Sequence, residues 1–209
     1  MANRTRRKNR DYAAAIFGLI LGIILGWMTR NPGNVYAVAE VVTSIGLWIF
    51  LSSLLAHFTT KQTVATIGGG VLGVGTVIGI VLREALRFDM SRTRGALLEG
   101  FDWIPYAGLF CVLLLVVAFL SWKARARDWI GALSGAVPIS ILIAEAVGAF
   151  PSIRGVLVFD IISAVVLFFL IFETKNKKLM ALPYIAIFSF LLIWFGIIAK
   201  LMETTTAWL

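Results

Sequence analysis

The sequence of 209 residues contains little charge: only 14% of its residues are Asp, Glu, Lys or Arg, while 60% are hydrophobic. Soluble domains average about 25% charged and about 45–50% apolar residues. A soluble domain of this length has too little interior to bury so much apolar surface. The composition and the mean hydropathy of +0.93 therefore exclude a soluble globular protein and predict an integral membrane protein.

The sequence also lacks the residues on which many kinds of site depend. It has one cysteine, Cys111, and one histidine, His57, so it forms neither an intrachain disulfide nor a Cys/His metal site. Nucleophile elbows, glycine-rich phosphate loops and HExxH sequences are absent. We therefore expect no catalytic residue, no metal site and no cofactor, and we do not expect an enzyme.

Apolar runs of about 20 residues, the length of a helix that crosses a bilayer core, recur along the chain. The alternating segments of about 10 residues that are typical of membrane β-barrels do not occur. We predict an all-α integral membrane protein that forms a single polytopic domain over residues 1–209. About seven transmembrane helices are expected, or six if two short spans form one re-entrant hairpin: Tyr12–Met28, Tyr36–His57, Thr63–Leu82, Phe101–Trp122, Trp129–Phe150, Ile153–Phe172 and Leu179–Met202.

The basic residues are distributed unevenly among the segments that connect these spans. A cytoplasmic N-terminus puts most Lys and Arg residues on the cytoplasmic side, as the positive-inside rule expects. Residues 1–11 then form a basic cytoplasmic segment, and residues 83–100 form a polar extracytoplasmic loop. The first span is long for a signal peptide and lacks a small-residue cleavage site, so we expect it to be retained. Anionic lipid headgroups account for the net charge of +8, and no nucleic-acid partner is expected.

Two distant stretches of the sequence resemble each other. The first span opens with DYAAAIFGLI and the fifth with DWIGALSGAV, and a proline, Pro32 or Pro151, follows each span. The next spans end in HFTTK and IFETK, and the two copies are separated by nearly the same number of residues there as at the start of the first and fifth spans. One interpretation is a 3+1+3 arrangement of parallel repeats related by an axis along the membrane normal. The other is chance similarity, because apolar sequences match one another easily.

Three acidic residues lie inside apolar spans at similar predicted depths. A rise of 1.5 Å per residue places Glu40 about 6 Å, Glu145 about 7–8 Å and Asp160 about 10 Å below the outer ends of their spans. An ionisable side chain in hydrocarbon costs about 2.5–3.5 kcal/mol on insertion scales, so it normally faces the bundle interior or a wet cavity. The three acids therefore predict a polar vestibule that opens to the exterior.

These acids fit two alternative functions. As a binding site, Glu40, Glu145 and Asp160 bind a cation, a proton or a cationic group of a substrate, with Arg83 and Arg154 as nearby counter-charges. As a structural feature, they form ion pairs, such as Glu145 with Arg154 or Arg83, that hold helix ends together. Pro138, two turns before Glu145, is expected to kink the fifth span.

Repeated GxxxG spacings occur in the first span, at Gly18, Gly22 and Gly26, and in the third span, IGGGVLGVGTVIGIV. The absence of side chains at such positions lets helix backbones approach closely. We expect close helix packing at these glycines, with a flexible or gating helix as the alternative.

In general pattern the chain resembles small multi-span bacterial membrane proteins of families without an assigned activity. The features that carry this resemblance are the short basic N-terminus, GLILGIILGWMTRNPG and GALSGAVPISILIAEAV. The resemblance implies the bacterial inner, or plasma, membrane and supplies no activity. The chain is also similar in size and in its glycine-rich first helix to substrate-capturing subunits of vitamin importers, which typically have six spans. It shares the suggested 3+1+3 plan with SWEET-type transporters but lacks their paired Pro-Gln motif.

These observations predict a small transporter or solute-binding permease with an outward-facing acidic vestibule. The alternative is a non-catalytic membrane subunit or assembly factor whose intramembrane charges are structural. The expected partners are membrane lipids, together with a small solute, proton or cation in the first case and other membrane subunits in the second.

Overall fold

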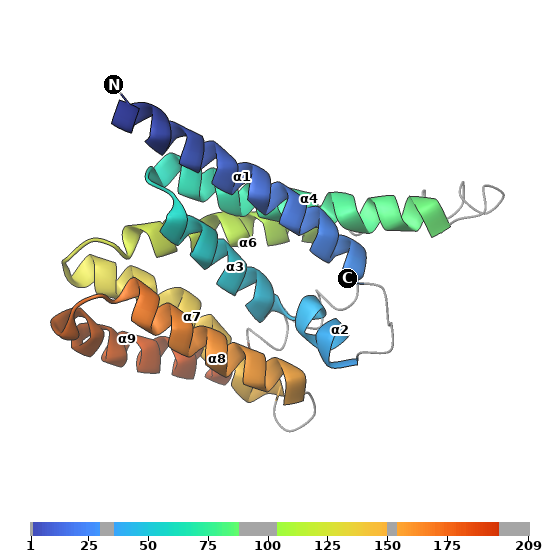
Figure 1. Ribbon diagram of the computed structural model, residues 1–209. Coiled ribbons are helices and arrows are strands. Elements are labelled where there is room, and N and C mark those ends of the chain that lie inside the picture. Colours follow the sequence, from blue (N-terminus) through green and yellow to red (C-terminus); the bar gives the residue numbers. More distant parts are fainter. Residues whose placement is uncertain (1, 30–35, 88–103, 150–153, 197–209) are drawn as a thin grey trace.

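The computed structural model describes residues 2–29, 36–87, 104–149 and 154–196 (Figure 1). Every regular element in these ranges is an α-helix. The helices are α1 (Ala2–Met28), α2 (Tyr36–Thr43), α3 (Ile45–Phe58), α4 (Gln62–Arg87), α6 (Ile104–Lys123), α7 (Trp129–Ala149), α8 (Arg154–Ile171) and α9 (Lys175–Trp194). Six of them, all except α2 and α3, are long and apolar enough to cross a membrane. The prediction of an all-α protein with helices long and apolar enough to span a membrane is thereby confirmed for the described residues.

The helix boundaries differ from the predicted spans in two instructive places. The predicted span Tyr36–His57 is divided into α2 and α3. At the start of the predicted outer loop, residues 83–87 continue α4 as regular helix. Residues 88–103 lie outside the described residues, and so do Pro32 and Pro151 of the predicted repeat.

The division between α2 and α3 occurs at Ser44, whose backbone is extended, with φ −75° and ψ 146°. The Ser44 hydroxyl donates to the Val41 carbonyl at 2.8 Å and accepts the Leu47 N–H at 3.4 Å. Serine favours this position because its side chain replaces the backbone hydrogen bonds that end with one helix and have not begun in the next. Ser44 is therefore the N-cap of α3.

Helix α3 lies in the middle of the bundle, where it packs against α1, α4, α6, α7 and α8 (Figure 1). On one side of α3, α1 runs along α4 and α4 packs against α6. On the other side, α7 packs against both α8 and α9, and α2 packs against α8. Because these five helices pack against α3, most of its residues are buried.

Glycines bring α1 and α4 close together. A Cβ atom on Gly26 of α1 would overlap the Thr76 carbonyl, and one on Gly79 of α4 would overlap the Ile23 carbonyl. On another face of α4, a Cβ on Gly69 would lie 2.5 Å from the Leu114 carbonyl of α6. The expectation of close packing at these glycines is confirmed, since each position has room for hydrogen only.

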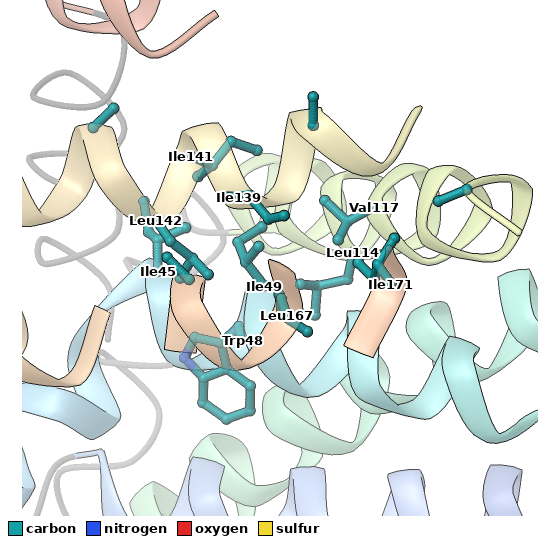
Figure 2. Close-up of a cluster of buried hydrophobic side chains, with 14 of the residues drawn as sticks. Ile45, Trp48, Ile49, Leu114, Val117, Ile139, Ile141, Leu142, Leu167 and Ile171 are labelled. Atoms are coloured by element: carbon teal, nitrogen blue, oxygen red, sulfur yellow. The ribbon is translucent and has the colours of Figure 1, made fainter. Parts of the chain in front are cut away.

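Buried apolar side chains fix α3 on both sides. Figure 2 shows Ile45 of α3 beside Leu142 of α7, while Trp48 points away from α7. There the Trp48 ring packs edge-to-face against Phe110, with 5.7 Å between ring centroids. The first turn of α3 is thus held in place by packing, and this turn carries the site described next.

Candidate functional site

Two acidic side chains meet at the first turn of α3. Glu145 of α7 and Asp160 of α8 are both 0% exposed. A Cβ atom built on Gly46 would overlap Oδ1 of Asp160 and would lie 2.8 Å from Oε2 of Glu145. Both carboxyl groups therefore converge on the α-carbon of Gly46, and we refer to Glu145 and Asp160 as the acid pair.

One oxygen of the acid pair is bound by the backbone of α3. Glu145 Oε1 accepts the Ile45 N–H at 2.9 Å, and the N–H of Gly46 also faces this carboxylate. Ile45 and Gly46 occupy the first two positions of the helix, where N–H groups have no partner within the helix. The N-terminal end of a helix dipole also favours negative charge. Glu145 thus satisfies the backbone that the division between α2 and α3 exposes.

The other three oxygens of the acid pair have no hydrogen-bond donor among the described residues. They are Oε2 of Glu145 and both Oδ1 and Oδ2 of Asp160. Most buried polar atoms in proteins are paired, and a buried group left unpaired costs about 1–3 kcal/mol. Three buried acceptors at one point form an arrangement that can bind a cation, a proton or a cationic group.

The structure places the other three predicted site residues elsewhere. Arg83 is buried, and its guanidinium donates to the Trp27 carbonyl in the last turn of α1 at 3.2 Å. Arg154 is exposed at the start of α8, and Glu40 is partly exposed on α2. Within the described ranges, no ion pair connects the acid pair to an arginine. Of the five predicted residues, the structure therefore brings together Glu145 and Asp160.

The opposite end of α3 is bound by a cation. The Arg125 guanidinium donates to the carbonyls of Thr59 at 2.7 Å and Ala56 at 3.0 Å, and also to the His57 carbonyl. These carbonyls lie in the last turn of α3 and just beyond it, where the helix dipole is negative and cations are favoured. In the sequence, Arg125 stands in a short basic segment, KARARD, between two apolar spans, and nothing in this segment indicates which helix end Arg125 contacts.

Two further contacts fix the helix ends on the Arg125 side. The Asp11 carboxylate, at the start of the first apolar run, accepts two hydrogen bonds from Thr60: one from its backbone N–H at 2.8 Å and one from the Thr60 hydroxyl at 2.6 Å. The Lys177 ammonium donates to the Ala124 carbonyl just after α6. The charged groups at this side of the bundle therefore hold helix ends in register.

Sequence reasoning also missed the backbone part of the site, namely Ile45 and Gly46. The available signal was the sequence TSIG inside an apolar span, since serine followed by glycine is typical of a helix boundary. The described residues contain no group of three or more His, Cys, Asp or Glu side chains that could hold a metal ion. Comparisons of the chain with protein-family models, with curated proteins and with solved structures found no match.

Proposed function

We propose that this protein is a small transporter or solute-binding permease that binds a cation, or a cationic group of a solute, at the acid pair. The observation that carries this proposal is the set of three buried carboxyl oxygens without a donor at the first turn of α3. Acidic side chains inside membrane proteins are costly and commonly mark ion or substrate paths.

The division between α2 and α3 supports the same function. Secondary transporters often bind their ligands at discontinuous helices, because the free helix ends supply partial charges and backbone groups within the membrane. Here the C-terminal end of α2 and the N-terminal end of α3 meet at Ser44, two residues from Gly46. The acid pair thus lies where a short movement of α2 changes access to it.

One packing relation, that between the outer helices of each half, supports the proposed 3+1+3 plan with seven crossings. In this plan α2 and α3 together form the second crossing and α6 is the linker. The first crossing, α1, packs extensively along the third, α4, and the fifth, α7, packs extensively along the seventh, α9. The proposed orientation has the N-terminus, and with it the Arg125 end of α3, in the cytoplasm of a cell whose plasma membrane contains the protein.

The proposed access is from the exterior. Both acidic side chains are 0% exposed, so the conformation described is closed around the acid pair. An outward-facing vestibule then corresponds to a second conformation, in which α2 and the outer ends of α7 and α8 separate. Alternating access in small transporters is commonly this kind of movement of helices around a fixed site.

A second candidate function follows from the bond between Glu145 and Ile45. If the acid pair only stabilises the division between α2 and α3, the protein is a non-catalytic membrane subunit or assembly factor. In that case other membrane proteins are its partners, and no small ligand binds to the acid pair.

A thermal-shift screen of the purified protein in mild detergent distinguishes these functions. The probes are sodium, potassium, lithium, methylammonium and guanidinium chlorides, followed by amino acids, polyamines and cationic vitamins, at constant ionic strength. Glu145→Gln and Asp160→Asn are measured in parallel. Glu173→Gln is the matched control, because Glu173 is an exposed acid between α8 and α9.

A ligand that binds only the folded protein raises its stability by about 2.7 kcal/mol at 100 times its Kd. The proposal expects a concentration-dependent rise in the melting temperature of the wild type and of Glu173→Gln, and no rise in the two acid-pair variants. If no probe stabilises the wild type, and Glu145→Gln is merely less stable than the wild type, the acid pair is structural. The second candidate, a non-catalytic membrane subunit or assembly factor, then replaces the proposed transporter.

A further inference from the structure

The two members of the acid pair have different environments. Glu145 is bound by the Ile45 N–H at the positive end of the α3 dipole, so its negative charge is stabilised by fixed backbone groups. Neither oxygen of Asp160 accepts a hydrogen bond from the described residues. The backbone therefore favours an anion at Glu145 and offers none of this stabilisation to Asp160.

Within the described residues, the helices packed against α8 place no cationic side chain against the acid pair. The helices that pack most closely against α8 are α7, α3 and α2. Helices α7 and α3 contain no Lys or Arg, and the titratable residue of α3, His57, lies at its opposite end. Helix α2 contributes a further acid, Glu40, and Arg154 is exposed at the start of α8.

Two adjacent carboxylates do not both remain charged when both are buried and no cationic side chain of the described residues lies beside them. A single proton on one of the two carboxylates removes the repulsion between them. A proton on Asp160 gives this side chain a hydroxyl group that can donate to Oε2 of Glu145, the other acceptor that faces Gly46. This one hydrogen bond uses two of the three unpaired oxygens, while Glu145 Oε1 keeps its bond to Ile45.

We propose that Asp160 carries the exchangeable proton of the acid pair, that Glu145 remains the anion, and that the ligand is a monovalent cation that enters as this proton leaves. The exchange is balanced: Asp160–COOH and a cation give Asp160–COO⁻ with the bound cation, and H⁺ is released. Its second part, exchange for a cation, rests on the proposed transport function.

The ligand class follows from the charge and the number of ligands. Before exchange the acid pair has one negative charge, and replacement of one proton by one monovalent cation keeps the total charge unchanged. Replacement of the same proton by a divalent ion would change this total by one unit. The described residues contain no group of three or more metal-binding side chains. An alkali cation, an ammonium or a guanidinium group therefore fits better than a divalent metal ion.

Infrared spectroscopy of the unmodified protein tests the proton assignment, because the carbonyl stretch of a protonated carboxyl group is separate from that of a carboxylate. Samples at neutral pH carry carboxyl ¹³C in aspartate only or in glutamate only. We expect a protonated-acid band that shifts with labelled aspartate and not with labelled glutamate. The band should be absent from Asp160→Asn and present in Glu173→Gln. A band that shifts with labelled glutamate, or no band in the wild type, overturns the assignment.

Cation addition tests the exchange separately. Each chloride salt from the thermal-shift screen is added to the weakly buffered protein, with a pH-sensitive dye to detect released protons. We expect one proton released per bound cation and loss of the aspartic-acid band. A band that persists while no salt stabilises the protein means that the transport function fails and the proton assignment stands. A salt that stabilises the wild type but leaves the band unchanged means that the proton-exchange inference fails while the binding site stands.

Discussion

The two ends of α3 are bound in opposite ways. At the C-terminal end, Arg125 donates to three backbone carbonyls. At the N-terminal end, the acid pair provides four carboxyl oxygens, of which only Oε1 of Glu145 is paired among the described residues. Both arrangements oppose the helix dipole with a charge of the favourable sign. They differ in how many of their polar atoms are satisfied.

This difference separates a structural contact from a candidate binding site. A guanidinium that binds the free carbonyls at a helix end stabilises the fold, and this contribution is enough to explain its presence. A second carboxyl group beside Glu145 contributes no such bond, and its burial costs free energy. Stability alone therefore explains Arg125 and Glu145, whereas Asp160 requires another explanation, and binding of a proton or cation supplies one.

The largest effect on this comparison is expected from Gly46→Ala. The added methyl group would overlap Asp160 Oδ1 and approach Glu145 Oε2, so we expect the free energy of unfolding to fall by about 3 kcal/mol, the upper end for overpacking. Denaturation in mild detergent with increasing SDS measures the change. Gly68→Ala is the matched control, because a Cβ on Gly68 of α4 has no atom within 4 Å, and it should not destabilise the protein. Equal effects of the two substitutions would show that the acid pair does not fill the space at Gly46.

At the other end of α3, Arg125→Ala is expected to lower the free energy of unfolding by about 1–2 kcal/mol, because it leaves backbone carbonyls unpaired. Arg125→Lys should recover only part of this loss, since an ammonium lacks the planar fork of a guanidinium. Arg127→Ala, at an exposed position two residues away, serves as the control and should have little effect. Cation-induced stabilisation should persist in Arg125→Ala, and its loss there would mean that the two ends of α3 are coupled.

A smaller effect is expected from Ser44→Ala, which removes the N-cap of α3. Loss of an N-cap side chain costs about 1 kcal/mol, and Glu145 still binds the Ile45 N–H in this variant. The same denaturation experiment measures the change. Combining Ser44→Ala with Glu145→Ala should cost more than the two single changes together, because the first turn of α3 then loses both acceptors. Simple additivity in this double-mutant cycle would contradict the shared role.

The smallest effect on stability is expected from Asp160→Asn. The side-chain amide of asparagine can donate to Glu145 Oε2 as the protonated Asp160 carboxyl group is proposed to do, so the change in the free energy of unfolding should stay within about 0.5 kcal/mol. The cation dependence of the melting temperature should nevertheless disappear, and its pH dependence should lose the part that comes from the acid pair. A loss as large as that of Gly46→Ala, with pH dependence retained, would make Asp160 a structural residue.

The class of protein could be predicted from sequence because it depends on composition and local pattern. Long apolar runs can be recognised without tertiary information, and the described residues contain six helices that are long and apolar enough to cross a membrane. The glycine spacings of the first and third spans similarly predicted close packing, because a position without a side chain allows any neighbouring helix to approach closely. Depth along a helix was enough to predict that Glu40, Glu145 and Asp160 lie at similar levels of the bundle, because helix rise is constant.

Tertiary structure alone decided what each charged residue contacts. Helix rise gives depth but not the direction around the axis, so the sequence could not distinguish Asp160, which faces Gly46, from Glu40, which is partly exposed on α2. It also could not assign Arg83 to the end of α1 or Arg125 to the end of α3, because those contacts join residues far apart in the chain. The sequence by itself determined that this chain is a bundle of membrane helices with buried acids. Only packing around α3 decided that two of those acids meet at the end of a divided helix, since their position depends on the rotation and register of three helices at once.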